Sequence, residues 1–408
     1  MADGRLTRSR LRDVRAWPAP VRVAAIYLVA RLVTTGIMLL VAQASPPDSR
    51  YGPDPGLVDY ILGWDAQWYW SVAASGYPTD LPLTDTGDVA ENAWAFLPLY
   101  AWLAALVGAV FAAWWVGAVL VSLAAGYGAC LALHALLRAR LDEDRATWGV
   151  VLLAAGPLAA LFQVGYAESL FLALLIAALL CVERRRWGWL YLLIPVMGFT
   201  RPGVLALALL IGLYGLWRLV PAVRRRMGGP ARAEVGHILA LGALATAAGF
   251  AWPRIAGVVT GEPDAYLETE LAWRRGWTGD DGGFTPFTGW PQAAAVWAEI
   301  WGIPVGAGYA LLAALVVVAT AAILWGARRA GAVLSLWGAA YVVYLLAVFF
   351  PQSSVFRLLL PLAPLACALL AWPRSRALRA VVLALCLVGQ CAWIHGMYGL
   401  GNTFWLIP

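Results

Sequence analysis

The chain has 408 residues, of which 62% are hydrophobic and 13% charged, and its mean hydropathy is +0.73. Soluble domains carry about 45–50% apolar and about 25% charged residues. One water-soluble core cannot hold this much apolar surface, so the composition excludes a cytosolic enzyme, a disordered protein and a disulfide-stapled secreted domain. We therefore predict an all-α protein that crosses a lipid bilayer many times.

The formal charge is +6, and all 29 basic residues are arginines. The arginines form short clusters between apolar runs, which is typical of the cytoplasmic loops of membrane proteins and not of a nucleic-acid-binding surface. We therefore expect a lipid bilayer and no nucleic acid among the partners. The five cysteines lie inside apolar runs and the three histidines are far apart, so we expect no disulfide framework, metal site or cofactor.

The first apolar run covers about residues 23–41 and follows a basic segment over residues 1–22. It is long enough to span a bilayer, so we expect an uncleaved membrane helix with a cytoplasmic N-terminus. Arg31 lies near the middle of this run. Because a charge there is costly in lipid, we expect Arg31 to face the bundle and to form a buried pair.

The later apolar runs predict a bundle of about 11 membrane-spanning helices in a single domain over residues 1–408. The run at 95–112 is excluded from this count, because counting it would place most arginine clusters outside. We expect it to be a juxtamembrane or re-entrant helix, and we expect an external C-terminus. The ten later spans are expected at about 114–137, 146–164, 167–182, 187–200, 203–220, 236–258, 304–325, 331–350, 357–372 and 379–397.

Two long polar stretches, 44–113 and 259–303, are both external in this topology, whereas the predicted cytoplasmic loops are short. Catalytic residues are often found on loops, so we expect the working face to be extracytoplasmic. The second stretch is rich in charge, and we interpret it either as a solvated face or as a surface that shapes acceptor choice. Its charged residues are Glu262, Asp264, Glu268, Glu270, Arg274, Arg275, Asp280 and Asp281.

The first long stretch contains a motif of aromatic residues around one acid. Trp64, Trp68 and Val72 recur every four residues, which predicts one face of a short helix lying along the outer interface. Asp65 lies among these aromatics, where partial desolvation would raise its pKa and make it a better proton acceptor. Alternatively, Asp65 caps a helix or forms an ion pair.

Further along this stretch, Pro98 fits the first turn of the juxtamembrane helix, and Glu91 precedes it where a negative charge would cap the helix dipole. The sequence contains none of the short motifs of nucleotide hydrolysis, dinucleotide binding, zinc peptidases or serine hydrolases.

In this order, the motifs resemble the PIG-V type of protein, the second mannosyltransferase of GPI-anchor synthesis, and its bacterial relatives. The resemblance runs from about residue 60 to 205 and is weaker around Arg357 and Pro361. Gly63 departs from it, because an arginine is expected before Trp-Asp, and so does Ala101, where a second proline is expected. The matching residues are Trp64-Asp65-Ala66, Trp68-Tyr69, Gly76-Tyr77, Glu91, Ala95-Phe96-Leu97-Pro98, Tyr166-Ala167-Glu168-Ser169-Leu170-Phe171 and Thr200-Arg201-Pro202-Gly203.

The resemblance implies an inverting glycosyltransferase of the GT-C superfamily. It implies transfer of mannose from a polyprenyl-phosphate-mannose donor to a lipid-linked glycan or glycolipid, without a metal, on the extracytoplasmic face of the cell membrane. Asp65 is then the general base. The implied substrate-binding residues are Trp64, Trp68, Tyr69, Tyr77, Glu91, Glu168, Arg201 and Arg357.

Arg201 and Arg357 both fall at predicted outer helix ends. A guanidinium group binds phosphate through two parallel hydrogen bonds, so each arginine is a candidate for stabilising the departing lipid phosphate. Each alternatively snorkels to the interface or forms a structural pair. Glu168 either orients the acceptor, pairs with one of these arginines, or is simply a carboxylate at a helix start.

Two other classes of function stay open. One is a transporter or flippase for a lipid-linked sugar, although transporters usually place ionisable groups near the midplane of the membrane. The other is a non-catalytic subunit of a transferase complex.

Overall fold

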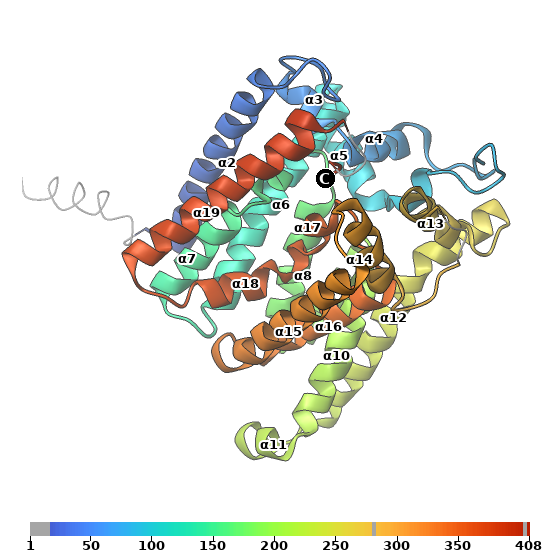
Figure 1. Cartoon of the computed structure of the whole chain (residues 1–408). Coiled ribbons are helices and arrows are strands. Elements are labelled where there is room, and N and C mark those ends of the chain that lie inside the picture. Colours follow the sequence, from blue (N-terminus) through green and yellow to red (C-terminus); the bar gives the residue numbers. More distant parts are fainter. Residues whose placement is uncertain (1–16, 280–282, 403–405) are drawn as a thin grey trace, which may run out of the picture.

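The computed structural model describes residues 17–279, 283–402 and 406–408. Within these ranges the regular secondary structure is helical, apart from one isolated β-bridge between Leu83 and Val89. The helices, in chain order (Figure 1), are α2 (Ala19–Gln43), α3 (Leu57–Ile61), α4 (Asp65–Ser75), η2 (Ala93–Ala95), α5 (Pro98–Gly108), η3 (Ala109–Phe111), α6 (Trp114–Leu137), α7 (Glu143–Ala154), η4 (Ala159–Phe162), α8 (Glu168–Glu183), α9 (Trp187–Gly198), α10 (Val204–Leu219), α11 (Pro221–Met227), α12 (Arg232–Thr260), α13 (Ala265–Thr278), α14 (Gly289–Ile300), α15 (Val305–Arg329), α16 (Ala332–Val348), α17 (Val355–Leu358), η5 (Leu360–Leu362), α18 (Ala363–Leu370), α19 (Arg376–Ile394) and the π-helix η6 (His395–Leu400).

The prediction of an all-α membrane protein is confirmed. Five helices in the described part of the chain are long and apolar enough to cross a bilayer, namely α2, α6, α12, α15 and α19 continued by η6. Helices α10 and α11 would add a sixth span if they are counted together across their 80° bend. The total of 11 spans stays a prediction, because several expected spans are short helices. For example, α7 and α9 have 12 residues each, or about 18 Å, against about 30 Å of hydrocarbon.

The expected span at 146–164 is interrupted, because α7 ends at Ala154 and Pro157 follows soon after. Arg31 of α2 lies at this break. Its guanidinium donates to the Ala154 carbonyl at 2.5 Å, to the Gln163 amide oxygen at 3.1 Å and to the Ala159 carbonyl. Arg31 is therefore buried as predicted, but its partners are carbonyl and amide oxygens and not a carboxylate.

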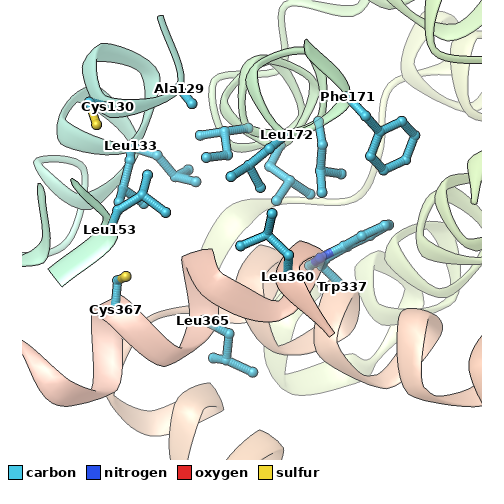
Figure 2. Packing of buried hydrophobic residues seen from close by; sticks show 14 of the residues in the cluster. Ala129, Cys130, Leu133, Leu153, Phe171, Leu172, Trp337, Leu360, Leu365 and Cys367 are labelled. Atoms are coloured by element: carbon cyan, nitrogen blue, oxygen red, sulfur yellow. The ribbon is translucent and has the colours of Figure 1, made fainter. Parts of the chain in front are cut away.

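Helices from both halves of the chain share one core. Figure 2 shows Leu133 of α6 and Leu172 of α8 packed near Leu360, Leu365 and Trp337 from the C-terminal helices. Between helices in a bilayer, close van der Waals packing of such side chains favours association. This shared core brings the beginnings of α4 and α8 close to α17.

The two long loops also pack against each other, so α4, α5 and α13 lie in one region of the molecule (Figure 1). The Asn92 amide donates to the Thr269 hydroxyl at 2.9 Å, and the Arg275 guanidinium donates to the Val89 carbonyl. Helix α5 begins at Pro98, as predicted, and its 11 residues span only about 16 Å. The run at 95–112 is thus too short to cross a bilayer as one straight helix.

Candidate active site

Asp65 is the first residue of α4 and follows a tight turn. The Ala66 amide donates to the Gly63 carbonyl at 3.1 Å, and Trp64 has φ 54° and ψ −123°. These angles are those of the first central residue of a type II′ turn, a position that normally holds glycine. A non-glycine residue there costs roughly 1–3 kcal/mol, so surrounding contacts must hold Trp64 in place.

Gly63, where the resemblance expects an arginine, lies in a space that excludes a side chain. A Cβ atom at this position would lie 2.0 Å from the Tyr51 hydroxyl and 3.2 Å from the Asp59 carbonyl oxygen. The departure therefore has a local steric reason, since Tyr51 fills the position that a longer residue 63 would need.

Asp65 belongs to a buried network of four charged side chains. The Arg357 guanidinium donates to Asp65 Oδ2 and lies 3.1 Å from Glu168 Oε1, while Arg201 Nη2 lies 3.4 Å from the same Glu168 oxygen. Glu168 is 2% exposed and both arginines are 8% exposed, whereas the Asp65 side chain is 20% exposed. Four residues predicted from separate motifs thus converge on one site.

The environment of this network raises the affinity of the Asp65 carboxylate for a proton. Burial raises the pKa of the Asp65 carboxyl above its usual value, the Arg357 charge opposes this rise, and the Glu168 charge adds to it. Asp65 and Glu168 are also the first residues of α4 and α8, so the positive ends of two helix dipoles point to the site. Asp65 therefore has both the raised pKa that was predicted and the ion pair that was given as the alternative.

Of the predicted aromatic residues, Tyr69 interacts electrostatically with all four charged side chains of this network. Its ring is buried against Phe96 and Tyr100, with centroids 5.3 and 5.1 Å away. Burial and the negative charges of Glu168 and Asp65 raise the Tyr69 pKa, which indicates that the carboxylates are close. The phenol therefore stays protonated beside the two acids.

The helix face that Trp64, Trp68 and Val72 were predicted to share is incomplete in α4. The buried side chains are Ala66, Tyr69 and Val72, and Trp68 is only half-buried. Trp68 instead stacks on Phe96, with centroids 5.5 Å apart. The reason is that α4 begins at Asp65, so Trp64 belongs to the turn and not to the helical repeat.

Trp64 and Tyr77 hold the surrounding structure. The Trp64 indole donates to the Met397 carbonyl at 3.0 Å, and the Arg50 guanidinium lies 4.1 Å from the Trp64 ring. The Tyr77 hydroxyl donates to the Phe96 carbonyl at 2.8 Å. Both residues were expected to bind substrate, and that stays a prediction; these contacts fix the positions of their side chains.

Glu91 is exposed, and the expectation that it caps a helix is wrong. The cap is its neighbour Asn92, whose side chain accepts a hydrogen bond from the Trp94 amide at 3.0 Å at the start of η2. Surrounding protein raises the pKa of Glu91. Among the described contacts, none joins Glu91 to the four charged side chains around Asp65.

Glu270 of α13 belongs to the charged run that was interpreted either as a solvated face or as a surface that shapes acceptor choice. Its side chain is exposed, yet the surrounding protein raises the pKa of its carboxyl to about 7, and the charges of Arg201 and Asp65 both act on it. The charged run around it suggested a solvated face. The signal that could have found it is its helical spacing from Tyr266 and Trp273, which share its face. Asp280 and Asp281 of the same run lie outside the described residues.

Tyr166, part of the Tyr-x-Glu-Ser motif, packs against Arg357 of the network. Its ring is fully buried, and the Arg357 guanidinium lies 5.3 Å from the ring centroid. Such a cation–π contact fixes the guanidinium without neutralising it. Within residues 17–279, 283–402 and 406–408, three or more His, Cys, Asp or Glu side chains nowhere form a group that could hold a metal ion.

No family model and no curated protein matches the sequence. The chain is similar to the solved oligosaccharyltransferase of Archaeoglobus fulgidus in complex with Zn and sulfate, with a TM-score of 0.48, 13% identity, and coverage of 90% of this chain and 52% of that chain. It is also similar to the archaeal oligosaccharyltransferase AglB of that organism in complex with an inhibitory peptide and a dolichol-phosphate (TM-score 0.47, 12% identity, 91% and 55% coverage). The chain thus spans about half the length of these structures.

Proposed function

We propose that the protein is an inverting glycosyltransferase that uses a lipid-phosphate sugar as donor. The observation that carries this proposal is the contact of Arg357 with both Asp65 and Glu168, which places a partly exposed acid beside buried cations. A transferase of this kind needs a base for the acceptor hydroxyl and positive charge for the departing phosphate.

Asp65 is the base in this proposal. Its Oδ2 accepts from Arg357, while the side chain stays 20% exposed and can reach a substrate. As the acceptor oxygen forms its bond to the anomeric carbon, the hydroxyl proton passes to the Asp65 carboxylate. The bond from the anomeric carbon to the phosphate oxygen breaks, and its electron pair stays on the phosphate. Attack from the opposite face inverts the anomeric centre.

Arg357 and Arg201 stabilise the departing phosphate. Its negative charge increases as the bond breaks, so a cation there stabilises the transition state more than the ground state. Glu168 touches both guanidinium groups and holds them on one side of Asp65. Of the roles expected for Glu168, pairing with an arginine is the one that these contacts support.

The sugar and the acceptor are inferred from the motif resemblance. It supports mannose on a polyprenyl phosphate as the donor and a hydroxyl of a lipid-linked glycan or glycolipid as the acceptor, joined by an α-linkage on the extracytoplasmic face. The helices that are long and apolar enough to cross a bilayer support substrates that are themselves carried on lipids.

The test is to incubate the purified protein with polyprenyl-phosphate mannose and a membrane lipid extract, and to measure products by mass spectrometry. We expect lipid species heavier by one hexose, which are absent with the Asp65→Asn variant. If the labelled donor instead crosses the membrane of reconstituted vesicles and no product forms, the protein is a flippase. If product forms only when a second protein is added, the chain is a subunit of a complex.

A further inference from the structure

Helices α4 and α13 present matching faces to each other. Asp65 and Trp68 are three residues apart on α4, and Glu270 and Trp273 are three residues apart on α13. Residues at this spacing lie on the same side of a helix. The rings of Trp68 and Trp273 touch edge to face, with centroids 5.9 Å apart. The two carboxylates therefore lie on the facing sides of two helices that are in contact.

Glu270 also has groups from two other elements around it. Tyr266 lies one turn earlier on α13, Tyr344 comes from α16, and Arg201 follows α9. Electrostatic interactions join Glu270 to Tyr266, Tyr344, Arg201 and Asp65. Glu270 thus has polar groups of the site around it, although α13 belongs to the segment that connects the long apolar helices α12 and α15.

Glu270 and Glu168 both lie near Arg201, but they differ in solvent exposure. Glu168 is 2% exposed and is enclosed by its two arginines, whereas Glu270 is exposed. A ligand arriving from water can therefore reach the Glu270 carboxyl but not that of Glu168. A carboxyl group beside tyrosine hydroxyls and a tryptophan ring can hydrogen-bond the hydroxyls of a sugar and pack on its apolar side.

We propose that Glu270, Tyr266 and Tyr344 form a binding subsite for the hydroxyl groups of the acceptor sugar, opposite the Asp65 carboxylate. The inference rests on the proposed glycosyl transfer and names a second element of the same site. The acceptor is favoured over the donor sugar because the donor is held by its phosphate at Arg357 and Arg201, while Glu270 lies on the exposed loop side.

The carboxyl can serve this role in either protonation state. The surrounding protein takes the carboxyl of Glu270 partly out of water and raises its pKa to about 7, so both forms are present near neutral pH. The ionised form accepts hydrogen bonds from sugar hydroxyls, and the protonated form also donates one. A glutamine at this position keeps the shape but removes the charge-assisted hydrogen bonds, which are stronger than neutral ones.

The test compares Glu270→Gln with the matched control Glu262→Gln, an exposed residue of the same loop. Transfer from polyprenyl-phosphate mannose is measured against increasing amounts of membrane lipid extract, and separately against increasing donor. Loss of a hydrogen bond to a charged group predicts an apparent KM for the extract that is about tenfold higher or more in Glu270→Gln. The donor KM should stay within about twofold, and the control should match the wild type.

An unchanged KM for the extract overturns the subsite, and so does a rise confined to the donor KM or a fall confined to kcat. If Glu270→Gln does not fold, Tyr344→Phe is measured in the same way with the same expectation. A second readout needs no turnover: saturation-transfer NMR with methyl α-mannopyranoside should show contact with the wild type and the control but not with Glu270→Gln. This separates the two proposals, because absent transfer with retained sugar contact refutes only the transferase, whereas absent sugar contact refutes the subsite.

Discussion

Asp65 and Arg357 are 292 residues apart in the chain, yet the Arg357 guanidinium donates a hydrogen bond to the Asp65 carboxylate. The same guanidinium lies 3.1 Å from Glu168. The first long loop and the C-terminal helices are therefore joined at the point where we place the chemistry. Any substitution in this pair can change both the activity of the site and the stability of the fold. Each variant therefore needs a measurement of activity and a measurement of stability.

Asp65→Asn should lower kcat for glycosyl transfer by about 10²–10⁴-fold, the usual contribution of a general base. The amide oxygen can still accept from Arg357, so the thermal unfolding temperature should change little. The exposed acid Asp80 in the same loop offers the control Asp80→Asn, which should keep full activity. A kcat for Asp65→Asn within threefold of the wild type would exclude Asp65 as the base.

Arg357→Leu should destabilise the protein by about 3–5 kcal/mol, because it leaves Asp65 and Glu168 buried without their shared cation. Arg357→Lys keeps the charge but loses the planar guanidinium, so it should retain most stability and show a higher donor KM. Thermal unfolding in detergent and donor titrations check the two effects. The control is Arg374→Leu, whose ion pair with Asp142 is exposed and should contribute at most about 1 kcal/mol. Equal stability of the two leucine variants would contradict the role given to Arg357.

How much of this site the sequence could predict depended on the motif around each residue. Asp65, Glu168 and Arg201 lie in short motifs with a recognisable order, and Arg357 lies in a weaker one, so all four could be singled out. Their mutual contacts could not, because they depend on packing between distant helices.

Glu270, in contrast, could not be singled out from the sequence. It lies in a charged run without a motif, and a charged run usually is a solvated face. Contacts such as that of Trp273 with Trp68, which join its helix to the first loop, turn it toward the site. For the fold, composition was enough to predict apolar helices, but the break after α7 depends on Pro157 together with the Arg31 hydrogen bonds, and no pattern of hydropathy encodes those.

The backbone strain at Trp64, which has a positive φ, can be tested by comparing two substitutions. Both Trp64→Gly and Trp64→Ala remove the indole that donates to the Met397 carbonyl, but only glycine tolerates a φ of 54° without strain. Trp64→Gly should therefore be more stable than Trp64→Ala by about 1 kcal/mol or more. Chemical or thermal unfolding of both variants measures this difference. The expectation fails if the alanine variant is the more stable of the two.

Arg31→Met should lower the free energy of unfolding by about 1–3 kcal/mol for each buried acceptor that it leaves without a partner. Three such acceptors depend on Arg31, namely the carbonyls of Ala154 and Ala159 and the amide oxygen of Gln163. Arg31→Lys should recover part of this loss. Thermal unfolding checks the order wild type, lysine, methionine, and a methionine variant as stable as the wild type would refute it.

Glu270 should make stability depend on pH. The pKa of its carboxyl is raised from 4.5 to about 7 in the folded protein, so the folded state binds the proton more tightly than the unfolded state. The free energy of unfolding should therefore fall as the pH rises from about 4.5 to about 7, and this part of the fall should be absent in Glu270→Gln. Melting temperatures at pH 5 and pH 8 test the sign. The melting temperature of Glu270→Gln relative to that of the wild type should be higher at pH 8 than at pH 5. Because the side chain is exposed, we expect a small effect.

The contacts of Trp64 and Asp65 also say when the site can form during biosynthesis. Trp64 is held by Met397 and lies 3.1 Å from the position a Cβ of Gly401 would take, while Asp65 is held by Arg357. A nascent chain that has released its first 350 residues from the ribosome therefore carries the Trp-Asp motif and Arg50, but neither Met397 nor Arg357. If the proposed function is correct, activity has to await the insertion of the final helices.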